Sequence, residues 1–526
     1  MQSADELMKR LEMLNAIGIA LSSERDINRL VELILLASKN LVNADAGTLY
    51  LVDHDVLRFE IVITQSLGIS LGGSTGKKPP FPPIRLYQED GQPNINNVVS
   101  CAVLYGQTIN IADAYVAHGY DFSGTKRFDA QTGYRSKSFL TVPLKNHENA
   151  IIGVLQLINA KLPDGEIGAF GEEDQRLVES LGSQAAIALT NRQLINQLEA
   201  LFESLINLIN TAIDDKSPYT GGHCERVPML TMLLAEAVNR VNYGPFKLFH
   251  MTERDRYELK IAGLLHDCGK ITTPVHVVDK ATKLETIFDR VSLVEARFEV
   301  LKRDTEIAFL RGQIDEATWR ARVAQYDDDY AFLAHANVGG EFMKPEAQQR
   351  VREIAALPRT DAKGQPVPFL SEEEVENLCI ARGTLTQAER QIINHHIEVT
   401  IQMLEALPWP KHLRNVPEYA GGHHERMDGK GYPRGLTRDQ MSVQARMMGI
   451  ADIFEALTAR DRPYKPGKTL SESLTILARM AKEQHVDLDL FEVFIRERVY
   501  LDYARMVLEP GQIDEVDEAA IMAMAR

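Results

Sequence analysis

The sequence predicts a multidomain protein, in which an N-terminal α/β domain precedes an almost entirely helical C-terminal region. Strand-like runs alternate with helical patterns over the first 190 residues. From Ser217 onward the apolar residues recur at helical spacing, with turns rich in Gly and Pro between the helices. The 526 residues also exceed one ordinary domain of roughly 100–200 residues. Several domains are therefore expected.

The composition is ordinary for a globular protein, with 44% hydrophobic and 25% charged residues. No apolar run reaches the ~18 residues of a membrane helix, and the N-terminus lacks the pattern of a signal peptide. A cytoplasmic protein with no membrane partner is expected. The net charge of −16 argues against binding polymeric nucleic acid, which needs basic surface, although a small nucleotide is not excluded. The four cysteines have no CxxC spacing, so no disulfide framework is indicated.

The first domain is expected over residues 1–190. Apolar residues at helical spacing between residues 12 and 42 predict a helix. Lys145–Asn149 has the composition of a hairpin turn. Strands are predicted at Gly47–Val52, Leu57–Thr64, Ser138–Leu144 and Ile151–Asn159.

The last helix of this domain is expected to run from Glu172 to about Asp214, and residues 191–214 form a helical linker. Leucines follow one another along it at alternating steps of four and three residues, at Leu194, Leu198, Leu201, Leu205 and Leu208. Such a seam is buried between two parallel helices in a coiled coil, which predicts a homodimer. The alternative is a helix packed on its own domain, because the same period describes both.

The helical region divides into three parts, over residues 215–283, 284–383 and 384–526. The middle part carries no metal-ligand pattern and is of domain size. Its apolar residues recur in a 3-4 pattern that predicts a helical hairpin or short coiled coil, and Pro358–Pro366 has the composition of an exposed loop.

Histidines and aspartates gather in the two outer parts. His266 and Asp267 directly follow an apolar helix, and burying such groups is costly unless they are paired or bind a metal. The others are His223, the doublet His395-His396, the doublet His423-His424, and Asp452. Imidazole and carboxylate groups are ligands of divalent transition metals. These residues are too many for one ion, so the pattern indicates a metal cluster that carries out hydrolysis.

The order of these residues resembles the HD superfamily of phosphohydrolases. His223, His266-Asp267 and Asp452 match its H…HD…D signature, and the added histidines with Gly431-Tyr432-Pro433 resemble the HD-GYP family, phosphodiesterases of cyclic di-GMP. The resemblance covers about residues 210–280 and 384–500. It implies an all-α metal-dependent phosphohydrolase domain, into which residues 284–383 are a helical insertion.

The resemblance also implies a ligand set for two divalent ions, of Fe, Mn or Ni, with Asp267 as the bridge. The remaining ligands would be His223, His266 and Asp452 for one ion, and His396, His423 and His424 for the other. His396 is preferred over His395 because its spacing to Thr400 matches the family's H-x-x-x-G helix, although exchange of the two stays open. Some members hold a third ion through a Glu, but Tyr219 stands there, so a binuclear site is expected.

Substrate contacts follow from the same resemblance. Lys270 would act on the scissile phosphate beside the catalytic Asp267, and Arg462 with Lys465 would hold phosphates or guanine. Each of the three cations also has the simpler interpretation of a solvated surface residue. Gly431-Tyr432-Pro433 would line the site or recognise GGDEF-domain proteins, although as a turn it needs no function.

The N-terminal domain is similar to GAF sensory domains, which consist of an antiparallel sheet flanked by helices. The similarity lies in Phe128–Leu144 and Ile152–Asn159. The N-K…F-x-x-x-D-E pattern of cyclic-nucleotide GAF domains is incomplete, because Ala160 replaces its Lys and Gln175 its Glu. An unknown small-molecule ligand is therefore expected, and a GAF domain that only dimerises is the alternative.

The resulting hypothesis is a GAF-regulated phosphodiesterase that opens cyclic di-GMP to pGpG and onward to GMP. One alternative is hydrolysis of another cyclic dinucleotide by the same site. The other is a metal-bound module of low activity that signals through protein partners.

Overall fold

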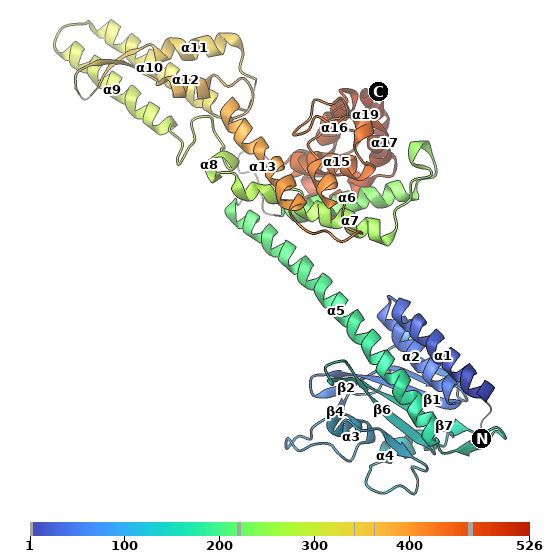
Figure 1. The fold of residues 1–526 in the computed structure, drawn as a ribbon. Coiled ribbons are helices and arrows are strands. Elements are labelled where there is room, and N and C mark those ends of the chain that lie inside the picture. The colour runs from blue at the N-terminus through green and yellow to red at the C-terminus, as the bar shows by residue number, and fades with distance from the viewer. Residues whose placement is uncertain (1–3, 218–221, 341, 362, 461–466) are drawn as a thin grey trace. The chain divides into compact units, whose positions relative to one another are not determined.

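The computed structural model describes residues 4–217, 222–340, 342–361, 363–460 and 467–526. The chain divides into two compact units, Met1–Phe202 and Glu203–Arg526. The first is an α/β unit and the second is helical, as Figure 1 shows for each unit by itself. The predicted multidomain fold is therefore confirmed.

The first unit contains one antiparallel sheet. Its strand order is β3-β2-β1-β7-β6-β5, with β4 paired to β2 and β8 to β7. The predicted hairpin joins β6 and β7, and Asn146 N donates to Ala150 O across it at 2.9 Å. The strands are β1 Ala44–Asp53, β2 Val56–Thr64, β3 Ile69–Gly72, β4 Ile84–Arg85, β5 Ile109–Ile111, β6 Phe139–Lys145, β7 Ile151–Lys161 and β8 Ile167–Gly168.

Helices cover both faces of this sheet (Figure 1). On one face α1 (Ala4–Ser23), α2 (Ile27–Leu41) and the start of α5 (Glu172–Lys216) share a core with β1, β6 and β7. On the other face lie α3 (Val98–Tyr105) and α4 (Ser123–Thr132). The helical pattern expected between residues 12 and 42 is present, but as two helices rather than one. Asp26 ends the first by accepting hydrogen bonds from Asn28 N and Arg29 N, which begins the second helix.

Helix α5 carries the leucine seam. The five leucines are 51–67% exposed in the single chain: Leu194, Leu198, Leu201, Leu205 and Leu208. A helix packed on its own domain would bury such a stripe. The exposure therefore leaves this face available to another chain.

The second unit consists of helices and short turns. The metal-ligand candidates lie on or beside α6 (His223–Arg240), α7 (Glu253–Leu265), α13 (Gln387–Glu405), α14 (Val416–Gly421) and α15 (Val443–Thr458). The remaining helices are α8 Val275–Val278, α9 Val291–Leu310, α10 Glu316–Asn337, α11 Pro345–Ala355, α12 Glu372–Leu378, α16 Leu470–Lys482, α17 Leu488–Arg496, α18 Val499–Val507 and α19 Glu518–Ala525.

Helices α9 to α12 pack around a hydrophobic cluster of their own. Phe298 is at its centre, with Phe369 at a ring distance of 4.4 Å and Leu333 fully buried. The exposed loop expected at Pro358–Pro366 is wrong in part. Its ends form β9 (Pro358–Thr360) and β10 (Pro366–Pro368), which pair as a small antiparallel hairpin.

Within the part of the chain that the structure describes, no helix is both long and apolar enough to cross a membrane. Cys101, Cys224, Cys268 and Cys379 are free thiols.

Candidate metal centre

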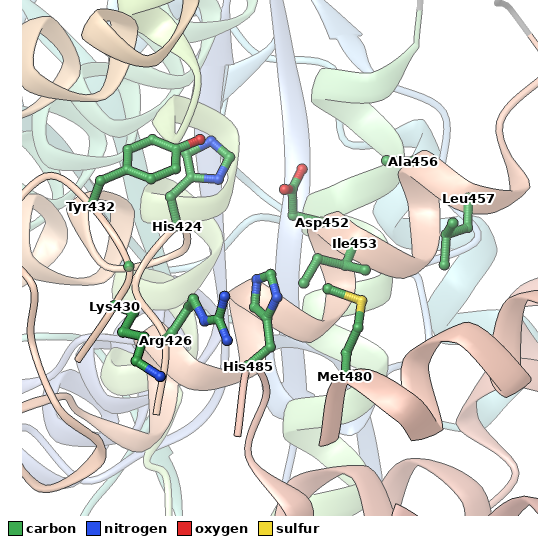
Figure 2. Close-up of a pocket in the computed structure, with 11 residues that line it drawn as sticks. His424, Arg426, Lys430, Tyr432, Asp452, Ile453, Ala456, Leu457, Met480 and His485 are labelled. Atoms are coloured by element: carbon green, nitrogen blue, oxygen red, sulfur yellow. The ribbon is translucent and has the colours of Figure 1, made fainter. Parts of the chain in front are cut away.

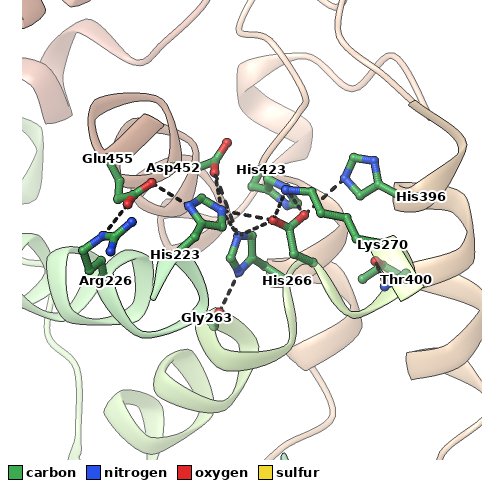
Figure 3. Close-up of polar contacts among 12 residues, drawn as sticks. His223, Arg226, Gly263, His266, Lys270, His396, Thr400, His423, Asp452 and Glu455 are labelled. Carbon is green, nitrogen blue, oxygen red and sulfur yellow. Dashed lines mark hydrogen bonds and ion pairs between the residues drawn. The ribbon is translucent and has the colours of Figure 1, made fainter. Parts of the chain in front are cut away.

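Five segments of the second unit deliver the predicted metal-ligand residues to one place. His223 begins α6, and His266 with Asp267 follows the end of α7. His396 lies in the middle of α13 and Asp452 lies in α15. The doublet His423-His424 follows α14 directly. Figure 3 shows the side chains of His223, His266, His396, His423 and Asp452 converging.

Asp267 lies at the centre of this cluster, with its two carboxylate oxygens facing different groups. Its Oδ2 is 3.1 Å from His223 Nε2 and 3.2 Å from His266 Nε2. Asp452 Oδ1 closes this group, at 3.4 Å from His223 Nε2 and 3.9 Å from His266 Nε2.

The other oxygen, Asp267 Oδ1, faces a second group of imidazoles. It lies 3.2 Å from His396 Nε2 and 4.0 Å from His423 Nε2. His424 Nε2 is 3.3 Å from His396 Nε2. The structure thus brings together all seven residues that the sequence nominated. His395, in contrast, is exposed and pairs with Glu398 at 2.7 Å.

Four of the imidazoles are held so that Nε2 faces the cluster. His266 Nδ1 donates to Gly263 O at 2.7 Å, His396 Nδ1 to Ile393 O at 2.5 Å, and His423 Nδ1 to Ala420 O at 2.6 Å. His223 Nδ1 donates to the Glu455 carboxylate at 2.5 Å. In the neutral imidazole these contacts keep the proton on Nδ1 and leave on Nε2 the lone pair that a metal needs.

The donor set fits two divalent cations. The groups His223, His266, Asp267 and Asp267, His396, His423, His424 each place their ligand atoms within 4.8 Å of one another. Within the described residues, Asp267 Oδ1 and His423 Nε2 are buried without a hydrogen bond. Buried polar atoms normally have a partner, and a cation between the groups would supply it.

The pKa values of the cluster residues are shifted in different directions. Burial and the neighbouring His266 lower the pKa of His423 to about 4, and burial with His423 also lowers that of His424. Burial opposes ionisation of Asp267, but the charges of Lys270 and His266 outweigh it and hold its pKa well below the usual range. His423 and His424 are therefore neutral beside an ionised carboxylate, which suits metal binding. At His223 burial opposes the charged form, but the hydrogen bonds to Asp267 and Glu455 outweigh burial and raise its pKa to about 9.

Glu455 is a residue of this site that the sequence argument missed. Its side chain is 1% exposed and lies between His223 and Arg226, whose Nε donates to Oε1 at 2.6 Å (Figure 3). A buried carboxylate on the far nitrogen of a ligand histidine orients the ring and raises its basicity. The sequence gives little indication of this contact, because 232 residues separate Glu455 from His223.

Gly269 allows the turn after Asp267 to approach α13. A Cβ at this position would lie 2.0 Å from His396 O. Gly269 N donates to Thr400 Oγ1 at 2.9 Å, so Thr400 ties the turn to the helix that carries His396. The close contact explains why a residue without a side chain follows the His-Asp pair.

The Gly431-Tyr432-Pro433 loop folds back over the cluster. The Tyr432 ring stacks on His424 at 4.8 Å and 19°, and Tyr432 N donates to His424 O at 3.3 Å. Glu425, buried at 3% exposure, accepts hydrogen bonds from Arg434 N and Leu436 N at 2.7 and 2.8 Å. Glu425 thereby fixes the loop beyond Pro433, a positioning role that the sequence argument did not assign.

Lys270 is partly buried beside the cluster, with Nζ at 2.5 Å from Asp267 Oδ2. Burial opposes its charge, but Asp267 and Asp452 outweigh this and raise the pKa of Lys270. The ammonium charge is therefore fixed next to the predicted bridge. Tyr219, Arg462 and Lys465 lie outside the described residues.

In the first unit, the residues matched to the cyclic-nucleotide pattern have structural contacts. Asn159 accepts from Lys137 N at 2.7 Å and donates to Arg135 O at 2.8 Å. Phe170 is buried in the core, and Asp174 accepts from Gly171 N at 3.0 Å.

Known protein families match both units. A GAF domain matches residues 26–189, and HD domains match residues 220–328 and 372–490. The two HD matches together enclose the residues of the His/Asp cluster in the second unit. The chain is a GAF and HD domain protein.

Curated relatives are cyclic-dinucleotide phosphodiesterases. A 3'3'-cGAMP-specific phosphodiesterase of Vibrio cholerae is 24% identical over 53% of this chain, and a second one is 42% identical over 23%. A cyclic di-GMP phosphodiesterase of Pseudomonas aeruginosa is 34% identical over 26%. The matches cover 35%, 27% and 32% of these relatives, so the chain spans about a third of their length.

Solved structures similar to the chain include the GAF domain of a phosphoenolpyruvate-protein phosphotransferase from Coxiella burnetii. It is 16% identical with a TM-score of 0.28, and the match covers 36% of this chain and 98% of that one. A GAF domain/HD domain protein from Geobacter sulfurreducens is 15% identical with a TM-score of 0.24, over 33% of this chain and 98% of that one.

Proposed function

We propose that this chain is an HD-GYP-type phosphodiesterase that hydrolyses cyclic di-GMP to linear pGpG and then to GMP. The observation that carries the proposal is the placing of Asp267 between two sets of imidazoles, one at each carboxylate oxygen. Similarity to cyclic-dinucleotide phosphodiesterases supports the choice of substrate class.

The proposed ligands of one ion are His223, His266, Asp267 and Asp452, and those of the other are Asp267, His396, His423 and His424. The ions are Fe, Mn or Ni, since nitrogen and oxygen ligands accept several metals of this row. Two such ions, when bound, lower the pKa of water and neutralise charge on a phosphate group.

The protein's own residues orient the reaction. Asp267 holds both ligand groups in register, and Lys270 places a fixed positive charge beside it, where the scissile phosphate would lie. Glu455 and the three backbone carbonyls keep the imidazoles in one tautomer. Arg462 and Lys465 are proposed to hold the phosphates or a guanine of the substrate.

A second candidate substrate is 3'3'-cGAMP. Two of the relatives are named as specific for it, and one of them is 42% identical over 124 residues of this chain. Both dinucleotides present the same phosphodiester to the metal centre, so the centre alone does not distinguish them.

Regulation is proposed to come from the GAF domain, through an unknown small-molecule ligand. The exposed leucines of α5, such as Leu198 and Leu208, would pair with those of a second copy in a parallel coiled coil. A GGDEF-domain protein is the proposed partner of the Gly431-Tyr432-Pro433 loop.

The test compares the two neighbouring histidines of α13. His396→Ala is expected to lose metal, measured by mass spectrometry on anaerobically purified protein, together with hydrolysis of cyclic di-GMP, measured by product chromatography. His395→Ala is the matched control, because the His395 side chain is 56% exposed and, among the described residues, pairs with Glu398 rather than with the cluster. Full metal content and turnover in His396→Ala would refute the proposal. Metal binding without turnover in the native chain would favour a signalling module.

A further inference from the structure

A pocket of about 480 Å³ opens beside the metal centre and shares His424 and Asp452 with it (Figure 2). Ligand pockets of small molecules measure roughly 300–1,000 Å³, so this one is large enough for a nucleoside. We call it the nucleoside pocket. Its lining includes Arg426, Ile453, Leu457, Met480 and His485.

The nucleoside pocket has two chemically different sides. Ile453 and Leu457 from α15 and Met480 from α16 form an apolar wall, which suits the face of an aromatic base. Arg426 and His485 lie next to each other at the other side, as Figure 2 shows. An apolar wall with a few fixed polar groups is the usual arrangement of a pocket that recognises one ligand.

The polar side is held in place by Asp428. Its carboxylate accepts from Arg426 Nη2 at 3.1 Å, and Asp428 N donates to Gln484 O at 3.2 Å. His485 N donates to Met480 O at 2.8 Å. Two segments that are distant in sequence are thereby joined, and the guanidinium and the imidazole are fixed side by side.

His485 is available to a ligand. Within the described residues its ring makes no hydrogen bond, although it is partly buried. Burial, and after it the charge of Arg426, lower the pKa of His485. The imidazole is therefore neutral at neutral pH and offers one N–H donor beside the donors of Arg426.

The two purines differ at the edge that such donors would meet. Guanine presents two acceptors, N7 and O6, whereas adenine replaces O6 with an amino donor. Arginine has donors only, so an amino group directed at Arg426 would leave two donors facing each other.

We propose that the nucleoside pocket binds a guanine base of the substrate, with Arg426 and His485 donating to its N7 and O6 edge. This inference rests on the proposed phosphodiesterase function and adds base specificity to it. Cyclic di-GMP and 3'3'-cGAMP each contain guanine and are accepted, whereas cyclic di-AMP is not. In 3'3'-cGAMP the single guanine fixes which phosphodiester is cut first, so one of the two linear products predominates.

The first measurement is nucleoside binding by titration calorimetry on the metal-loaded, full-length chain. Guanosine is expected to bind at least about tenfold more tightly than adenosine, given the usual worth of a paired contact to a base edge. His485→Leu keeps the volume but removes the donor, and is expected to reduce this preference severalfold. His412→Leu is the control, because His412 is exposed and lies outside the pocket. If His485→Leu fails to fold, His485→Gln takes its place in the test. This variant retains a donor and is expected to keep the preference for guanosine.

The second measurement is kcat/KM for the three cyclic dinucleotides, with the order of the linear products from 3'3'-cGAMP. Equal binding of guanosine and adenosine would overturn the inference, as would inorganic phosphate displacing guanosine, which would make the pocket a phosphate site. A guanosine preference that depends on His485, in a chain that hydrolyses no cyclic dinucleotide, would support the pocket and refute the proposed phosphodiesterase.

Discussion

Replacing Glu455 with Gln tests whether this carboxylate prepares His223 for metal. Glu455 accepts from His223 Nδ1 at 2.5 Å and from Arg226 Nε at 2.6 Å, and its side chain is 1% exposed. A Gln amide has one donor end and one acceptor end. If its oxygen stays with Arg226, its NH₂ group faces His223 and forces the ring proton onto Nε2, the atom that faces the cluster.

The size of the effect follows from the same contacts. Burial raises the pKa of Glu455, but His223 and Arg226 outweigh burial and lower the pKa from 4.5 to about 2. At about 1.4 kcal/mol for each pKa unit, this lowering corresponds to about 3–4 kcal/mol of net stabilisation of the carboxylate, with the cost of burial already subtracted. If about half of this stabilisation comes from His223, the substitution weakens metal binding by about 1–2 kcal/mol. This agrees with the 10–100-fold weakening of metal affinity that is typical of such substitutions.

The assay is metal affinity, measured by competition with a chromophoric chelator and by metal content after dialysis. Only the group that contains His223 should weaken, so at limiting metal the content should fall from two ions per chain toward one. Glu374→Gln is the matched control, because Glu374 is a similarly buried carboxylate that pairs with Arg297 at 2.7 Å and has no histidine partner among the residues that the structure describes. A folded Glu455→Gln chain whose affinity for both ions stays within twofold of the native chain would refute the orienting role.

Three further predictions concern the site, the interface and stability. Lys270→Ala should lower kcat by about 10²-fold at normal metal content, since a preorganised charge at the phosphate is lost; unchanged turnover would contradict its role. Leu201→Glu with Leu205→Glu should halve the mass seen by light scattering, and an unchanged mass would exclude the coiled coil. Asp487→Asn should cost about 3 kcal/mol of unfolding free energy at pH 7, because it removes a fully buried carboxylate from its ion pairs with the half-exposed Arg438 and the nearly buried Arg446. Burial opposes ionisation of Asp487, but these arginines outweigh burial and lower its pKa below 3.8. The stability that the ion pairs contribute is therefore present above the unfolded-state pKa near 3.9. It is lost as the pH falls through the folded-state pKa. Urea titrations should show the difference between variant and native chain shrinking below about pH 4, and a constant difference would contradict this origin.

The metal-ligand residues were predictable from the resemblance to the HD superfamily, and for one pair a local pattern adds a chemical reason. A His-Asp pair directly after an apolar helix, as in His266-Asp267, is expensive to bury without a metal. His396 was preferred over His395 because its spacing to Thr400 matches the H-x-x-x-G helix of the family that the sequence resembles, with exchange of the two left open. The structure places His396 in the cluster and leaves His395 exposed.

Other features carried no signal of this kind. Strands β4 and β8 have two residues each, too few for an alternating pattern. The break at Asp26 depends on a capping hydrogen bond that apolar periodicity does not report. Glu455 lies on a helix whose apolar neighbours explain its burial equally well, and its partner His223 comes from the other end of the domain sequence. Contacts between polar groups that are distant in the sequence were therefore the features that the sequence predicted least well.

Residues 284–383, expected to be an insertion, separate the two halves of the metal centre in the sequence, yet the ligand residues of both halves lie together. The chain leaves and returns at two buried lysines. Lys280 Nζ contacts Asn377 Oδ1 at 2.7 Å and the Glu389 carboxylate at 2.8 Å, and Lys283 Nζ donates to Leu378 O at 2.9 Å and Ile380 O at 2.8 Å. Glu389 lies in the first turn of α13, the helix that carries His396. Because both ends of the insertion are tied together at the start of α13, its own helices can form a separate core without moving His396 away from Asp267.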